Sequence, residues 1–155
     1  MLLKQYYNFE HSILDIANDF HEAYKRCVKG ESTHFDEYGR TVQNVVNVPA
    51  IVNGAFACEL YIKSMLPSDD SWGHNLYELF YELPDNLQSL IKAEIECLVC
   101  HKDLTCECIL NNLSEAFVFW RYIHEKPDFG KFGLNDTLKV LPILLFVFEK
   151  YAENK

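Results

Sequence analysis

The stretch "NVPAIVNGAFACELYIKSML", residues 47–66, carries the helical periodicity on which the expected fold depends. Asn47 is a candidate N-cap, and Pro49 fits the first turn because its missing N–H would have no helical partner there. Apolar residues then recur at three- and four-residue steps, which places them on one helical face: Ile51, Ala55, Cys58, Ile62 and Met65. The pattern predicts a helix that Pro67 ends.

Similar spacing runs through most of the chain. It predicts further helices that reach about Lys29, occupy residues 74–83, 84–100 and 104–126, and begin again near Asn135 or Asp136. The segment "GESTHFDEYGRTVQN", residues 30–44, is expected to be the longest loop. We find no strand alternation and no internal repeat. The sequence therefore predicts one all-α domain over residues 1–155, an up-and-down bundle of about six helices.

Composition restricts the classes of function. The chain has 155 residues, of which 49% are hydrophobic and 24% charged, as in ordinary globular domains. Its net charge of −9 disfavours non-specific binding to nucleic acid. We see no secretion signal, and the apolar run "VLPILLFVF", residues 140–148, is too short to span a bilayer and is expected to be a core helix. We expect a cytoplasmic protein that does not enter a membrane.

Cysteines are concentrated in "CLVCHKDLTCEC", residues 97–108. On a helix, Cys97, Cys100 and His101 would face one way, and Cys106 or Cys108 could complete a zinc site. The spacing is not that of a standard zinc finger, and free cysteines commonly fill helix bundles as small apolar residues. The sequence thus predicts no metal or cofactor, with a zinc-stabilised bundle as an alternative.

The stretch "AFVFWRYIHEK", residues 116–126, places Arg121 and His124 one helical turn apart. A guanidinium can hold a phosphate by two hydrogen bonds, and an imidazole can move a proton near neutral pH. Such a pair could cleave RNA without a metal by using the 2′-hydroxyl as the nucleophile. The alternative is that His124 belongs to a core row and that Arg121 pairs with Glu125 or Glu59.

Two further polar positions are candidates for a structural role. Glu59 and Lys63 are four residues apart, which favours a surface ion pair worth a few tenths of a kcal/mol. His74 lies beside a turn at an expected helix start, where a hydrogen-bonded or capping histidine is the common case.

Three segments together resemble HEPN domains. "AFACELYIKSML" matches small–x–Glu–Leu–x–x–Lys–x–x–Leu, and "GHNLYELFYELP" matches the His–x–Leu–x–x–Leu helix that follows a turn. "FVFWRYIHEK" resembles the W-R-Y-x-Y-E version of a later helix, with His124 in place of the second Tyr. The resemblance covers roughly residues 48–126. It implies a helical bundle that often pairs as a two-fold dimer, in a family with many metal-independent ribonucleases and some binding modules.

Carried over by position, Arg121 would hold the phosphate and His124 would be the acid or base, oriented by Glu125 or Glu59. Only two residues separate Arg121 from His124 here, whereas the family motif has four to six. Glu59, Lys63 and His74 match the structural signature of the family. We therefore expect a homodimeric HEPN-like domain of prokaryotic defence, toxin–antitoxin or RNA-metabolism type, a degenerate ribonuclease with RNA or a cognate protein as partner. A non-catalytic interaction module with a structural Arg/Glu network is the alternative.

Overall fold

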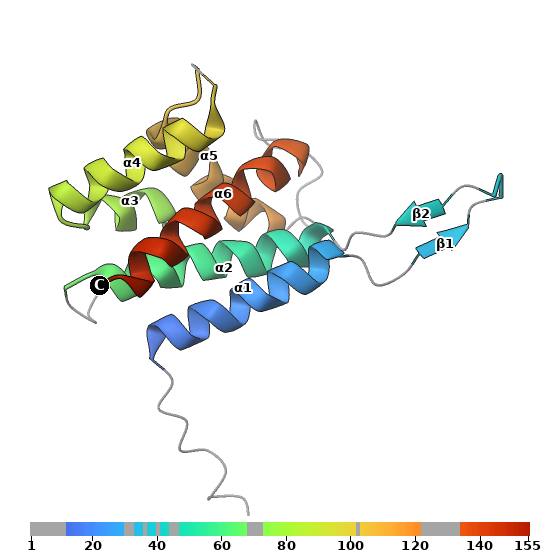
Figure 1. Cartoon of the computed structure of the whole chain (residues 1–155), viewed down its shortest axis with the longest axis horizontal. Coiled ribbons are helices and arrows are strands. Elements are labelled where there is room, and N and C mark those ends of the chain that lie inside the picture. The colour runs from blue at the N-terminus through green and yellow to red at the C-terminus, as the bar shows by residue number, and fades with distance from the viewer. Residues whose placement is uncertain are drawn as a thin grey trace, which may run out of the picture.

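The computed structural model describes residues 12–29, 33–35, 37–39, 41–43, 47–67, 73–101, 103–121 and 134–155. Within these ranges six helices form a bundle, and two short strands form a hairpin beside it (Figure 1). In chain order the elements are α1 (Ile13–Lys29), β1 (Thr33–Phe35), β2 (Thr41–Gln43), α2 (Asn47–Met65), α3 (Leu76–Tyr81), α4 (Asp85–Val99), α5 (Cys106–Arg121) and α6 (Leu134–Glu153). The prediction of an all-α bundle of about six helices is confirmed.

Most helix ends follow the signals in the sequence. Helix α1 ends at Lys29, as predicted, and α2 begins at Asn47 with Pro49 in its first turn. Helix α3 begins two residues later than predicted, because Asn75 is its N-cap. The Asn75 side chain accepts a hydrogen bond from the backbone N–H of Glu78 at 3.2 Å.

Two side chains cap the start of α5. Thr105 Oγ1 accepts a hydrogen bond from the N–H of Cys108 at 3.2 Å. Glu96 Oε1 reaches across from α4 and accepts one from the N–H of Cys106 at 3.0 Å. The prediction extended this helix to residue 126. The described part of α5 ends at Arg121, and the remainder of the predicted helix lies outside the described residues.

An antiparallel hairpin lies in the segment that was expected to be a loop. Thr33 pairs with Gln43 and Phe35 with Thr41, so each strand has only three residues. The hairpin projects away from the helices (Figure 1). The loop prediction was wrong for these six residues, because strands this short do not produce a detectable alternation of apolar and polar side chains.

Helix α2 is the central helix of the bundle. It packs against α1 along its length and also contacts α3, α5 and α6 (Figure 1). Gly54 permits the close approach of α6, since a Cβ at this position would lie 2.6 Å from Cδ2 of the buried Leu141. The buried side chains of α2 are those of Ala50, Ile51, Ala55, Ala57, Cys58, Glu59, Tyr61, Ile62 and Met65.

The apolar run at residues 140–148 belongs to α6. Pro142 lies inside this helix and is exposed, whereas most of the run is buried: Val140, Leu141, Leu144, Leu145, Val147 and Phe148. The prediction of a core helix is confirmed. Across the described ranges, we find no helix with both the length and the apolar character needed to cross a membrane.

A partly buried polar cluster joins α1 to α2 and α6. The Tyr61 hydroxyl donates to Asn18 Oδ1 at 2.8 Å and lies 3.0 Å from Nδ1 of His21. Since the single hydroxyl proton is directed to Asn18, His21 Nδ1 must carry its own proton and donate to Tyr61. Glu149 Oε2 is 3.5 Å from the same nitrogen. His21 is therefore a hydrogen-bond donor that holds α1 onto α2.

We predict that the free energy of unfolding falls as the pH drops below about 6.5, because His21 then binds a proton in the unfolded chain but not in the folded one. Burial and the positive charge of Lys25 lower the pKa of His21 from 6.5 to about 4, so between these values the unfolded chain binds more protons than the folded one. Stability should therefore drop by about 2 kcal/mol from pH 7 to pH 5 because of this group alone.

Urea unfolding at several pH values, monitored by circular dichroism, measures this loss. The reference is His21→Gln, which keeps an N–H donor and does not titrate. The wild type should lose more stability than His21→Gln between pH 7 and 5. Parallel pH profiles for the two proteins would contradict a neutral His21.

Candidate functional site

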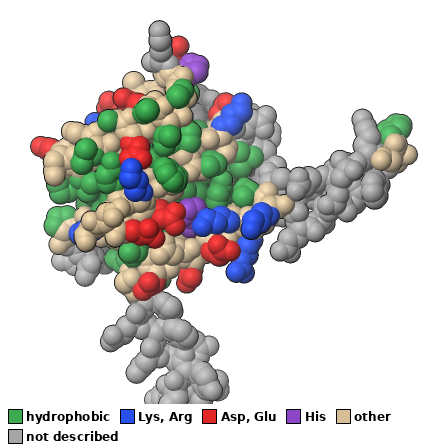
Figure 2. Space-filling view, viewed as in Figure 1, with side chains coloured by type: hydrophobic (Ala, Val, Ile, Leu, Met, Phe, Trp, Pro, Cys, Tyr) green, Lys and Arg blue, Asp and Glu red, His purple; other side chains and the backbone are tan. Residues whose placement is uncertain are grey.

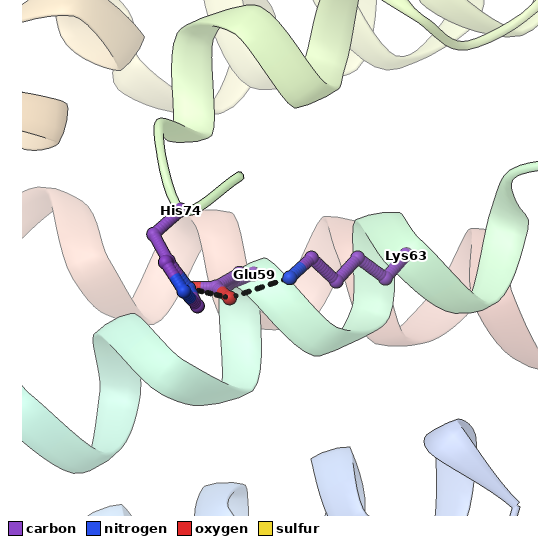
Figure 3. Close-up of polar contacts among 3 residues, drawn as sticks. All are labelled: Glu59, Lys63 and His74. Atoms are coloured by element: carbon purple, nitrogen blue, oxygen red, sulfur yellow. Dashed lines mark hydrogen bonds and ion pairs between the residues drawn. The ribbon is translucent and has the colours of Figure 1, made fainter. Parts of the chain in front are cut away.

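A polar site on α2 centres on Glu59. Glu59 lies on α2 with a side chain that is only 7% exposed, and Lys63 lies one turn further along the same helix. Lys63 Nζ is 2.9 Å from Glu59 Oε1, and His74 Nδ1 is 2.8 Å from the same oxygen (Figure 3). Lys63 and His74 thus meet at one oxygen of Glu59.

The chain around His74 is shaped to place this residue over α2. Gly73 has φ of +133°, a conformation that side-chain-bearing residues rarely adopt, so glycine is needed for the chain to turn here. The next two residues have separate tasks, since His74 contacts Glu59 and Asn75 caps α3. Ser114 Oγ on α5 accepts a hydrogen bond from the backbone N–H of Tyr77 at 2.9 Å, which holds the start of α3 against α5.

The electrostatics of the site follow from the burial of the Glu59 carboxylate. A buried carboxylate is unfavourable unless it is paired and hydrogen-bonded. Here Lys63 and His74 both donate to one oxygen of Glu59. The Lys63 side chain is 15% exposed, and the His74 side chain is 72% exposed. The spacing of Glu59 and Lys63 favoured a surface ion pair. That interpretation was wrong about burial, because α2 lies at the centre of the bundle.

The bond to Glu59 also sets the state of the His74 ring. Nδ1 must carry the proton that it donates to the carboxylate, and the His74 side chain as a whole is 72% exposed. A histidine oriented in this way by a carboxylate can accept or release a proton at Nε2. The arrangement therefore serves either to anchor the chain before α3 or to orient an exposed imidazole.

The predicted catalytic pair is only partly covered by the structure. Arg121 is the last residue of α5, which packs against α2, but its side chain is outside the described residues. His124 and Glu125 also lie outside them. The proposed pairing of Arg121 with His124, Glu125 or Glu59 stays a prediction.

The predicted metal-ligating face does not form on α4. The helix ends at Val99, and Cys100 has a left-handed φ of +51°, so Cys100 and His101 leave the helical face that Cys97 occupies. Cys100 Sγ instead donates to the carbonyl oxygen of Cys97 at 2.8 Å. The prediction of a shared face was wrong because the helix ends at Val99, before Cys100 and His101.

The other two cysteines of the segment also diverge. Cys106 is fully buried, and burial raises the pKa of its thiol to about 12, whereas Cys108 is exposed. In the part of the chain that the structure describes, no three His, Cys, Asp or Glu residues are grouped closely enough to hold a metal ion.

The partly buried cluster of Asn18, His21, Tyr61 and Glu149 was missed by the sequence analysis. One signal was present: His21 lies four residues after Ala17 and three before Tyr24, both of which belong to the apolar stripe of α1. A polar residue at such a position needs a buried partner. Its partners lie 40 and more residues away in the chain, so periodicity alone does not identify them.

Comparison with known proteins adds no assignment. The chain has no significant match among protein-family models, among well-characterised proteins or among solved structures.

We predict that Glu59→Ala strongly destabilises the protein. Removal of the carboxylate leaves Lys63 largely buried without its partner and frees the His74 segment, at a cost of about 3 kcal/mol in the free energy of unfolding. Urea unfolding measures this difference.

Glu94→Ala is the matched control. Glu94 also pairs with a lysine, at 2.7 Å from Lys150 Nζ, but this pair is far more exposed. The control should lose much less stability than Glu59→Ala. Equal losses in the two variants would show that the burial of Glu59 has no special energetic role.

Proposed function

We propose that this chain is a HEPN-like helical domain that acts as a non-catalytic interaction module in prokaryotic defence, toxin–antitoxin or RNA-metabolism systems. The observation that carries the proposal is the convergence of Lys63 and His74 on one oxygen of the buried Glu59 carboxylate. A carboxylate held by two donors of its own chain serves the packing of α2 and the segment before α3. Binding is then the task of the surface.

Arg121 has a structural role in this proposal. It ends α5, a helix in contact with α2, and it would extend the polar network of Glu59 from that side. The homodimer implied by the resemblance would bring two such bundles together, with a cognate protein as the further partner. The shortened spacing between Arg121 and His124 is consistent with a domain that has lost catalysis.

A metal-independent ribonuclease is the second candidate, and one observation favours it. His74 is 72% exposed, and its Nδ1 is held by a buried carboxylate, as in sites where a histidine moves protons through Nε2. In this case Arg121 would hold the scissile phosphate. A histidine, either His124 or His74, would take the proton from the 2′-hydroxyl as that oxygen attacks phosphorus. The P–O5′ bond would break to leave a 2′,3′-cyclic phosphate, and the departing 5′-oxygen would take up a proton.

RNA cleavage by metal-free protein separates the two functions. For the interaction module, we expect no cleavage above the level of buffer by the wild type, His74→Ala, His124→Ala or Arg121→Ala. Arg121→Ala should also melt well below the wild type, because the network would lose a buried charge.

The ribonuclease makes the opposite prediction. Cleavage by the wild type that is lost in Arg121→Ala and in one histidine variant, with melting temperatures unchanged, would refute the non-catalytic proposal. The histidine whose loss abolishes cleavage would then identify the acid or base. Glu94→Ala serves as the folded control in both assays.

A further inference from the structure

Helices α4 and α6 share an exposed apolar face. Leu90 and Leu98 on α4 are 55% and 43% exposed, and Phe146 on α6 is 55% exposed. Pro142, one turn before Phe146, is also exposed. Figure 2 shows hydrophobic side chains gathered over these two helices on the side turned to the viewer. Large apolar side chains grouped in this way are typical of a surface that binds another protein. We call it the α4–α6 face.

A groove continues this face at the end of α4. It has a volume of about 660 Å³ and lies between the α4–α5 turn, α5 and α6. Its apolar lining includes Val99 and Ile143. Val99 directly follows Leu98 on α4, and Ile143 lies one turn before Phe146 on α6. The groove is therefore adjacent to the α4–α6 face.

Charge distinguishes the groove from the face. On the face, Glu94 and Lys150 neutralise each other across α4 and α6, at 2.7 and 2.9 Å. In the groove, Asp103 and Asp136 are both exposed. Lys139 is the one Lys or Arg among the described residues that line it. The surface thus combines a neutral apolar strip with a weakly acidic end.

We propose that the α4–α6 face and its groove bind a basic amphipathic helix of a partner protein. Apolar side chains of that helix would pack on Leu98, Ile143 and Phe146. A lysine or arginine would place its apolar stem on the groove wall and its charge beside Asp103 and Asp136. The net charge of −9 attracts a basic partner at long range.

The same charges disfavour two other occupants. RNA would bring phosphates towards Asp103 and Asp136, which repel them. A second copy of this chain carries its own charge of −9, and its α4–α6 face has no excess of basic groups to offer in return. A dimer of this protein would therefore use a different surface.

The inference rests on the proposed interaction role, and a peptide-binding assay tests it. The probe is a synthetic peptide of about 15 leucine and lysine residues. Its leucines recur at three- and four-residue steps, so that they lie on one face of a helix and the lysines on the other. A peptide of the same composition in scrambled order is the control probe. By fluorescence anisotropy we expect the amphipathic peptide to bind at least about tenfold more tightly than the scrambled one.

Surface variants locate the binding site. Phe146→Ser, and Asp103→Asn combined with Asp136→Asn, should each weaken binding by about fivefold or more. Val118→Ser and Asp19→Asn change an exposed apolar and an exposed acidic residue elsewhere, and binding by these controls should stay within about twofold of wild type. Circular dichroism and melting curves establish that all variants are folded.

Three results would overturn the inference. They are equal affinity for the scrambled peptide, wild-type affinity in the Phe146 and Asp variants, or a dimer in sedimentation that Phe146→Ser dissociates. The last result would assign the face to a second copy of the chain. Failure here is distinct from failure of the proposed function, because RNA cleavage decides that function and does not depend on peptide binding.

Discussion

The buried carboxylate of Glu59 is the constraint on which much of the structure depends. A charge in the centre of a helical bundle is tolerated only where donors reach it, and here one donor comes from α2 and the other from the segment before α3. The chain must therefore turn back onto α2 after that helix ends. Gly73 has a positive φ directly before His74, and Asn75 caps α3 directly afterwards.

The same central helix organises the other interior contacts. Tyr61 lies two residues after Glu59 and joins α2 to His21 on α1, while Gly54 allows α6 to approach closely. Polar groups inside the bundle are thus committed to holding helices together. The exposed face of α4 and α6 has one such contact, between Glu94 and Lys150, while its large apolar side chains Leu90, Leu98 and Phe146 stay exposed. These exposed side chains support the proposal of a protein that works by binding through its surface.

Helical periodicity made most of the fold predictable, because it is a local property of the chain. The stripe in residues 47–66 identified α2, and Pro49 marked its first turn. Local reasoning failed where a residue's environment depends on distant segments. Glu59 and Lys63 were recognised as a pair, but their burial depends on helices that pack around α2. The bond between Glu59 and His74 links α2 to the segment before α3, and helical periodicity does not predict how the chain between them runs.

The cysteine segment shows how one helix end changes a chemical interpretation. A helix continued by two residues would have put Cys97, Cys100 and His101 on one face. A left-handed residue at Cys100, where glycine is more usual, ends α4 and separates them. The hairpin was missed for a different reason, since three-residue strands contain too few side chains to show alternation.

A double-mutant cycle on Glu59 and His74 tests the central claim most directly. The free energies of unfolding of Glu59→Gln, His74→Ala and the double variant would be compared with wild type by urea unfolding. If the carboxylate holds the segment before α3, the two residues should be coupled by about 1 kcal/mol or more. Strictly additive effects would contradict the account, because they would mean that the contact between Glu59 and His74 stabilises nothing.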